Sequence, residues 1–129
     1  MAKIRTLTLP WTTLITNVTS DAFYPATGWM PAAGVEEVRA SIEVVERTNN
    51  LSVRCGYQVA DVVDSASPGK ALGSAVTDNG VSFGTSFTNV TSDTQGKQLI
   101  RFGYLFANAT STSQSTGRVA GKLDVQVCG

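Results

Sequence analysis

Histidine is absent from the 129-residue sequence. This side chain is the usual general base near neutral pH, the commonest zinc ligand and the central member of a Ser-His-Asp triad. The sequence also lacks a glycine-rich loop between a strand and a helix and a Walker-type loop, so nucleotide chemistry is not predicted either. We therefore expect the protein to bind or assemble rather than to catalyse a reaction.

Charged residues are scarce, at 16% of the chain against the roughly 25% of an ordinary soluble domain. Ten Lys and Arg balance ten Asp and Glu, and the basic residues are scattered from Lys3 to Lys122 without a run. A surface that tracks phosphates needs clustered basic residues, so no nucleic-acid partner is expected. A surface with zero net charge has little self-repulsion, which suits a protein that sits in an assembly.

Long apolar runs are also missing. No stretch approaches the roughly 20 residues that span a bilayer, and residues 1–10 lack the apolar centre of a secretory signal, so we expect no membrane partner and synthesis in the cytoplasm. The two cysteines fit a reducing compartment. Cys55 shares the inward parity of its strand and Cys128 the outward parity, which argues against a disulfide, although a twist in the final residues would leave the pairing open.

Alternation of apolar and polar residues with a period of two is the dominant pattern that is present. It is clear in residues 38–44 and again in residues 51–59, and the intervening segment 47–50 contains residues that tolerate positive φ. These two runs predict a β-hairpin. Residues 99–106 are apolar at nearly every position and predict a central strand, with the alternating run 119–127 as its partner. The polar stretch 108–117 between them predicts an exposed loop or hairpin tip.

Shorter strand candidates bring the total to about eight, and helix is expected only as a short turn near residues 60–65. The additional candidates are residues 4–9, 12–18, 72–77 and 81–87. The sequence therefore predicts one all-β domain over residues 1–129, an antiparallel two-sheet sandwich with jelly-roll topology as the leading choice. The inward parity of the strands predicts a core that includes Ile42, Val44, Val53, Tyr57, Phe102, Tyr104, Leu123 and Val125.

Carboxylates are the remaining candidates for catalysis and metal binding. Glu37 and Glu43 share an outward parity and could line a groove in the manner of a glycosidase pair, but alternation with Arg39 is ordinary surface design. Asp61 and Asp64 could donate oxygens to calcium, yet two local ligands are few and turn capping is the favoured role. No catalytic residue, metal site or cofactor is predicted.

Aromatic residues concentrate in the N-terminal region, residues 1–34. The predicted partner-binding residues are Trp11, Phe23, Tyr24, Trp29 and Met30. Residues 21–34 predict a long connection that either plugs one end of the sandwich or presents these side chains to a partner, and a sugar-stacking platform would use the same residue types. The strand at residues 3–9 is expected to be too short to be stable alone, so we expect it to add to a neighbouring subunit's sheet edge.

A small sandwich with this composition, poor in charge and histidine and rich in Thr, Ser, Asn and Gly, resembles the decoration (cement) and accessory virion proteins of tailed bacteriophages. The resemblance covers the whole chain in composition and architecture and assigns no functional residue. It implies a virion protein, made in the host cytoplasm, that stabilises the capsid exterior by binding the major capsid protein or another virion protein. It also implies a homo-oligomer, with a trimer favoured. The alternative is a carbohydrate-binding or adhesion module that uses Trp11, Tyr24 and Trp29.

Overall fold

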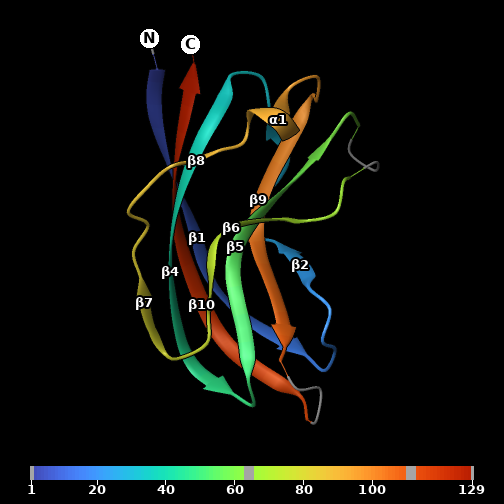
Figure 1. Cartoon of the computed structure of the whole chain (residues 1–129), viewed down its shortest axis with the longest axis vertical. Helices are drawn as coiled ribbons and strands as arrows, with labels where there is room; N and C mark the ends of the chain where they lie inside the picture. Colours follow the sequence, from blue (N-terminus) through green and yellow to red (C-terminus); the bar gives the residue numbers. More distant parts are fainter. Residues whose placement is uncertain (1, 63–65, 110–112, 129) are drawn as a thin grey trace.

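The computed structural model describes residues 2–62, 66–109 and 113–128, which form two antiparallel sheets packed face to face (Figure 1). The β1 sheet consists of β1 (Ala2–Thr16), β10 (Ser115–Cys128), β4 (Val35–Thr48), β7 (Gly80–Ser82) and β8 (Thr88–Asn89). The β9 sheet consists of β2 (Ala22–Pro25), β3 (Met30–Pro31), β9 (Leu99–Asn108), β5 (Leu51–Ala60) and β6 (Lys70–Val76). None of the described helices is long and apolar enough to cross a membrane.

The strand order is that of a jelly roll. In the β1 sheet it is β1-β10-β4 followed by β7 and β8, which both pair with β4; in the β9 sheet β2 and β3 both pair with β9, followed by β5 and β6. With β2 and β3 taken as halves of one broken edge strand, and β7 and β8 as halves of another, eight strands remain. Successive strands then change sheet at every step except β5 to β6, which gives the two nested Greek keys of a jelly roll. The predicted sandwich and its leading topology are confirmed.

Both predicted hairpins are wrong. Residues 38–44 and 51–59 lie in β4 and β5, which belong to opposite sheets, and the same holds for β9 and β10. Period-two alternation shows which side chains face inward but not which sheet a strand joins, because a turn across the end of a sandwich preserves the same inward parity as a hairpin. Asn49 and Asn50 have positive φ, as the turn prediction required, but their turn crosses between the sheets.

The polar stretch predicted as an exposed loop over residues 108–117 is shorter in the structure, because β9 and β10 extend into it. Asn108 and Ser115 at its two ends are buried. The Asn108 side-chain amide donates to the carbonyl of Ser113, and the Ser115 hydroxyl donates to the carbonyl of Asn49. These bonds satisfy the buried polar groups and fasten the β9–β10 connection to the β4–β5 turn.

The first strand also corrects the prediction. Instead of a short element that needs a neighbouring subunit, β1 runs for 15 residues and pairs with β10 of the same chain from Ala2 to Thr16. A register shift between Leu9 and Thr12 accommodates Pro10, so the separately predicted strands at residues 4–9 and 12–18 belong to one strand. A β-bulge at a sheet edge is a position at which proline is tolerated.

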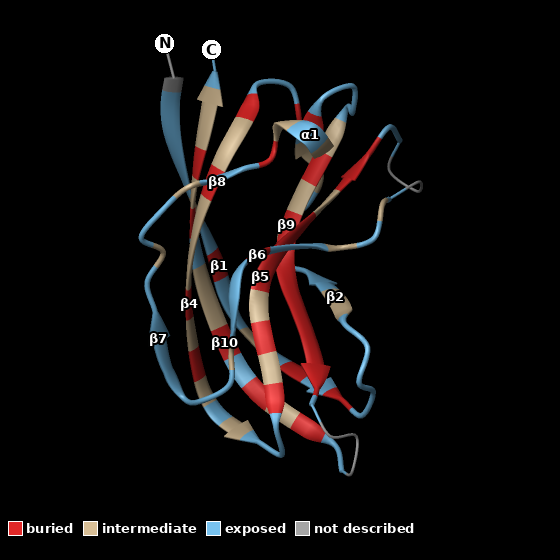
Figure 2. Ribbon diagram, viewed as in Figure 1, coloured by how far each residue is buried: buried red, intermediate tan, exposed pale blue. Residues whose placement is uncertain are grey.

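All eight predicted core residues are buried between the sheets, where Figure 2 shows the alternating bands of buried positions. Cys55 is buried, Cys128 is exposed, and both thiols are free, as their opposite parity predicted. The helical turn expected near residues 60–65 falls partly on residues 63–65, outside the described residues. A four-residue helix, α1 (Thr91–Thr94), lies elsewhere, between β8 and β9.

Candidate functional site

The structure separates the five predicted partner-binding residues instead of gathering them. Trp11 lies at the β1 bulge with 47% of its surface exposed, and the Arg118 guanidinium carbon sits 5.5 Å from its ring centroid. Phe23 and Tyr24 lie on β2 and Met30 on β3, at the opposite sheet's edge. No single patch therefore contains all five side chains.

The segment predicted as a connection over residues 21–34 supplies β2 and β3, which pair with β9 at the edge of its sheet, and its residues Met30 and Ala32 pack on the core. Phe23 pairs with Leu105 and Met30 with Ile100 in the ladder to β9. The Arg101 guanidinium carbon lies 4.3 Å from the Trp29 ring centroid, and Arg101 Nε donates to the Gln58 side-chain oxygen over 2.8 Å. Tyr24 alone of this group is largely exposed.

The outer face of the β9 sheet is covered by its own chain. Leu105 is only 4% exposed although it alternates outward on β9. Gly69 packs against it so closely that an added Cβ would lie 2.8 Å from a Leu105 methyl and 3.0 Å from the Phe23 ring. Ser67 fastens this segment to Val59, donating its backbone N–H to the Val59 carbonyl over 2.9 Å. Figure 1 shows residues 66–69 crossing β5 and β9 before β6 begins.

The outer face of the β1 sheet is more open among the described residues, although residues 84–87 pack beside Arg39, with 4.6 Å between its guanidinium carbon and the Phe87 ring centroid. The exposed large apolar residues of this face, besides Trp11, are Ile4, Ile15, Val81 and Phe83. Phe83 is 75% exposed, the highest fraction among them. These four residues were not among the predicted partner-binding residues; the outward parity of Ile4 and Ile15 in a threonine-rich strand was the available signal.

An ion pair lies in the middle of this open face. Arg39 of β4 donates to Asp124 of β10 through Nη2 at 2.8 Å and Nε at 3.2 Å, and the Thr6 hydroxyl donates to the same carboxylate over 3.1 Å. Bonding to Arg39 is the main reason that the pKa of Asp124 is lowered from its ordinary value, because both donors stabilise the ionised form. The pair links the neighbouring strands β4 and β10.

The carboxylate pair considered for glycoside hydrolysis is not formed. Glu37 pairs with Gln126 in the ladder, and Glu43 pairs with Ala120. Six residues of extended strand separate the two by about 20 Å, against the roughly 5–10 Å that a glycosidase pair requires. Asp61 faces Lys97, with 3.5 Å between its carboxylate and the ammonium, while Asp64 lies outside the described residues. The described residues contain no group of three or more side chains suited to a metal ion.

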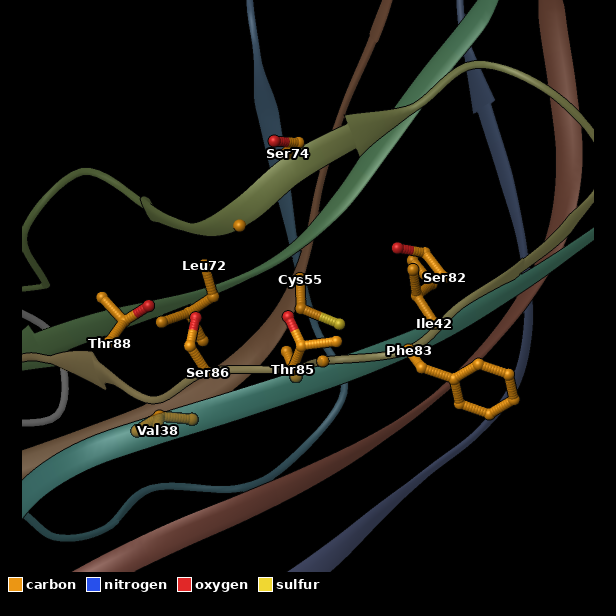
Figure 3. Close-up of a pocket in the computed structure, with 13 residues that line it drawn as sticks. Val38, Ile42, Cys55, Leu72, Ser74, Ser82, Phe83, Thr85, Ser86 and Thr88 are labelled. Atoms are coloured by element: carbon orange, nitrogen blue, oxygen red, sulfur yellow. The ribbon is translucent and has the colours of Figure 1, made fainter.

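A cavity of about 280 Å³ opens between the sheets where the edge strand breaks into β7 and β8. Figure 3 shows Val38, Ile42, Leu72 and Cys55 around it, together with the hydroxyl side chains of residues 82–88. No charged side chain lines the cavity. Burial raises the pKa of the Cys55 thiol to about 12, so the thiol is protonated at neutral pH and is a poor nucleophile. The cavity therefore offers shape and hydroxyl groups but no acid, base or reactive thiolate.

No protein-family model matches the chain, and no curated protein matches it. Solved structures do. The VP2 subviral particle of infectious bursal disease virus aligns over 99% of this chain with a TM-score of 0.68 and 12% identity, and the T=1 particles derived from that virus align over 99% with 0.67 and 12%. The Gx strain of the virus aligns over 100% with 0.64 and 10%. The chain spans about a third of each viral chain (33%, 32% and 32%), and the likeness establishes a shared sandwich fold.

Proposed function

We propose that this protein is a structural component of a virion, located on the capsid exterior, which it stabilises by binding the major capsid protein or another virion protein. The observation that carries the proposal is the full-length similarity of its jelly roll to a domain-sized part of a viral capsid protein. Jelly rolls also occur in lectins, so the fold alone does not select between the two functions. The surface supplies the remaining argument.

The open face of the β1 sheet supports a binding role. Monomeric soluble proteins seldom leave a contiguous group of large apolar side chains in water, and such groups mark contact sites. Trp11 stands at the β1 edge of this face and Val81 and Phe83 stand at the β7 edge, so the face has apolar anchors on both sides of the Arg39–Asp124 ion pair. Glu43 and Lys122 are charged side chains beside the β7 anchors. We infer that Trp11 and Phe83 contact the shell, with Tyr24 a second exposed contact at the opposite sheet's edge, while Phe23, Trp29 and Met30 serve mainly the protein's own packing.

The geometry of the tryptophans argues against the carbohydrate-binding alternative. A sugar ring stacks on an open aromatic face, but one face of Trp11 and one face of Trp29 are occupied by the guanidinium groups of Arg118 and Arg101. Among the described residues, Tyr24 and Phe83 are exposed aromatic rings without a stacked cation. They belong to different sheets, so they do not form one stacking platform for a glycan.

Binding to shells tests the proposal. Purified protein is mixed with capsids, prepared without it, of the virus whose genome encodes the chain, and the bound fraction is measured by co-sedimentation. We expect saturable binding, a loss of at least about tenfold in affinity for the Trp11→Ser, Phe83→Ser double variant, and no change for the control Ala75→Ser on β6. Absence of binding together with a positive glycan array would overturn the proposal in favour of the lectin function.

A further inference from the structure

The four lateral edges of the sandwich are unequal. Two are interrupted: β7 and β8 have three and two residues, and β2 and β3 have four and two. The third, β6, has seven residues and a register shift, with Gly73 at a φ of +84°. In β1, by contrast, residues 2–9 and 12–16 form two continuous arms. Short and broken edges offer few backbone groups to another chain, whereas the two arms of β1 offer a long row of them on either side of its bulge.

We propose that the free edge of β1 pairs with β1 of a second copy of this chain, antiparallel and across a two-fold axis near Leu9 and Pro10. The two β1 sheets then become one continuous sheet, with residues 3–7 of each copy opposite residues 12–16 of the other. This proposal deepens the function proposed above by naming the contact between subunits. Pairing a strand edge with its own copy satisfies backbone groups on both chains at once.

The outward side chains of β1 are self-complementary in this arrangement. Ile4 and Ile15 stand near opposite ends of the strand and are 60% and 53% exposed. A two-fold axis at Leu9 and Pro10 places Ile4 of each copy opposite Ile15 of the other, with Thr6 opposite Thr13 between them. Opposed apolar and threonine pairs are favourable across an antiparallel ladder, and a two-fold contact forms each pair twice.

The charges of β1 select the antiparallel direction. Lys3 and Arg5 are its charged residues, and both lie in the first arm. Parallel pairing would set Lys3 beside Lys3 and Arg5 beside Arg5, which is unfavourable. Antiparallel pairing moves these charges to opposite ends, where they face the neutral arm 12–16. The bulge and Pro10, which has no N–H to donate, fall at the centre between the arms.

Charges placed at residues 4 and 15 test the register of the pairing. The molar mass is measured by light scattering across a concentration series for the wild type, the Ile4→Glu, Ile15→Lys double variant and the Ile4→Lys, Ile15→Lys double variant. In the antiparallel dimer residue 4 lies opposite residue 15 of the partner on the same face, whereas within one chain the two positions lie far apart along β1, so the like-charge double variant should have a dimer dissociation constant at least about tenfold above that of the opposite-charge double variant. The difference should shrink at high salt. Ala75→Lys and Ala75→Glu on the β6 edge serve as matched controls and should dimerise like the wild type.

Three outcomes would overturn the proposal. They are a wild type that stays monomeric at its highest soluble concentration, equal dissociation constants for the like-charge and the opposite-charge double variants, and a trimer, because a two-fold contact closes at two copies. An unchanged far-UV spectrum and a cooperative melt verify that each variant is folded. These measurements contain no capsid, so loss of dimerisation and loss of capsid binding are separate results.

Discussion

The outer faces of the two sheets differ in how far their apolar side chains are exposed to water. On the β9 sheet Leu105 and Ala107 are 4% and 7% exposed, because the chain crosses over its own sheet and the broken edge strand carries Phe23 across it. On the β1 sheet Trp11 and Phe83 remain in water. Folding of the chain therefore buries the apolar side chains on one outer face, whereas it leaves apolar side chains exposed on the other face, where a partner can cover them.

Truncation of the covered face should have the largest effect on stability. Leu105→Ala removes a side chain enclosed by Gly69 and its neighbours and leaves a cavity, so we expect a loss of about 2–5 kcal/mol in the free energy of unfolding. Ile15→Ala on the open face should change it by less than about 0.5 kcal/mol at concentrations where the protein is monomeric. Urea denaturation measures both, and equal losses would refute the comparison.

The close contact between β2, in the broken edge strand, and β9 can be tested by a single substitution. At Gly103 an added Cβ would collide with the backbone carbonyl of Tyr24, so Gly103→Ala must push β2 away from β9. We expect a loss of about 1–3 kcal/mol. Gly28→Ala is the matched control, because no heavy atom lies within 4 Å of a Cβ added there. If both variants unfold at the same urea concentration, the close contact between β2 and β9 is not real.

The ion pair on the open face should contribute less, and its contribution should depend on pH. The folded-state pKa of Asp124 is lowered, so the stability it contributes is present above its unfolded pKa of about 4 and is lost as the pH falls through the folded value. Because the pair is partly exposed, we expect less than about 1 kcal/mol. Thermal melts of the wild type and Asp124→Asn should differ at pH 7 and converge in acid. A constant difference at every pH would contradict the assignment.

The reactivities of the two thiols give a comparison of the interior with the surface that involves no change in stability. Both thiols have a raised pKa, Cys55 through burial and Cys128 through a hydrogen bond with Glu36, but Cys128 is exposed to the reagent whereas Cys55 is buried. A thiol reagent should therefore modify one cysteine per native chain rapidly and the second only in denaturant. Rapid reaction of both in the folded state would show that the cavity beside Cys55 admits the reagent, and Cys128→Ser would identify which thiol had reacted.

The inward face of each long strand was predictable from the sequence, because alternation of apolar and polar residues with a period of two indicates which side chains are buried. Sequence reasoning failed on pairing: β4 and β5 have the same inward parity in a hairpin as in a turn across the sandwich, and no local residue separates the two cases. It also divided β1 into strands at residues 4–9 and 12–18, because the bulge that accommodates Pro10 between them depends on pairing with β10. A first strand of that short length led to the expectation that it depends on another subunit.

The candidate site was less predictable than the fold. Trp11 and Tyr24 were selected by residue type and are exposed, but the roles of Phe23 and Trp29 depend on Gly69 and Arg101, which are distant in sequence and adjacent only after folding. Phe83 could not be distinguished from a buried strand residue, because its exposure follows from the break between β7 and β8. Tertiary context decides such cases, since apolar residues occur on surfaces as well as in cores.

Cryo-electron microscopy of capsids incubated with the purified protein tests the central proposal most directly. We predict ordered density for the sandwich on the outer surface of the shell, with the open face of the β1 sheet, including Trp11 and Phe83, against the capsid. Capsids that carry no such density after incubation at saturating concentration would contradict a virion role, and density attached through the covered face of the β9 sheet would contradict the assignment of the binding surface.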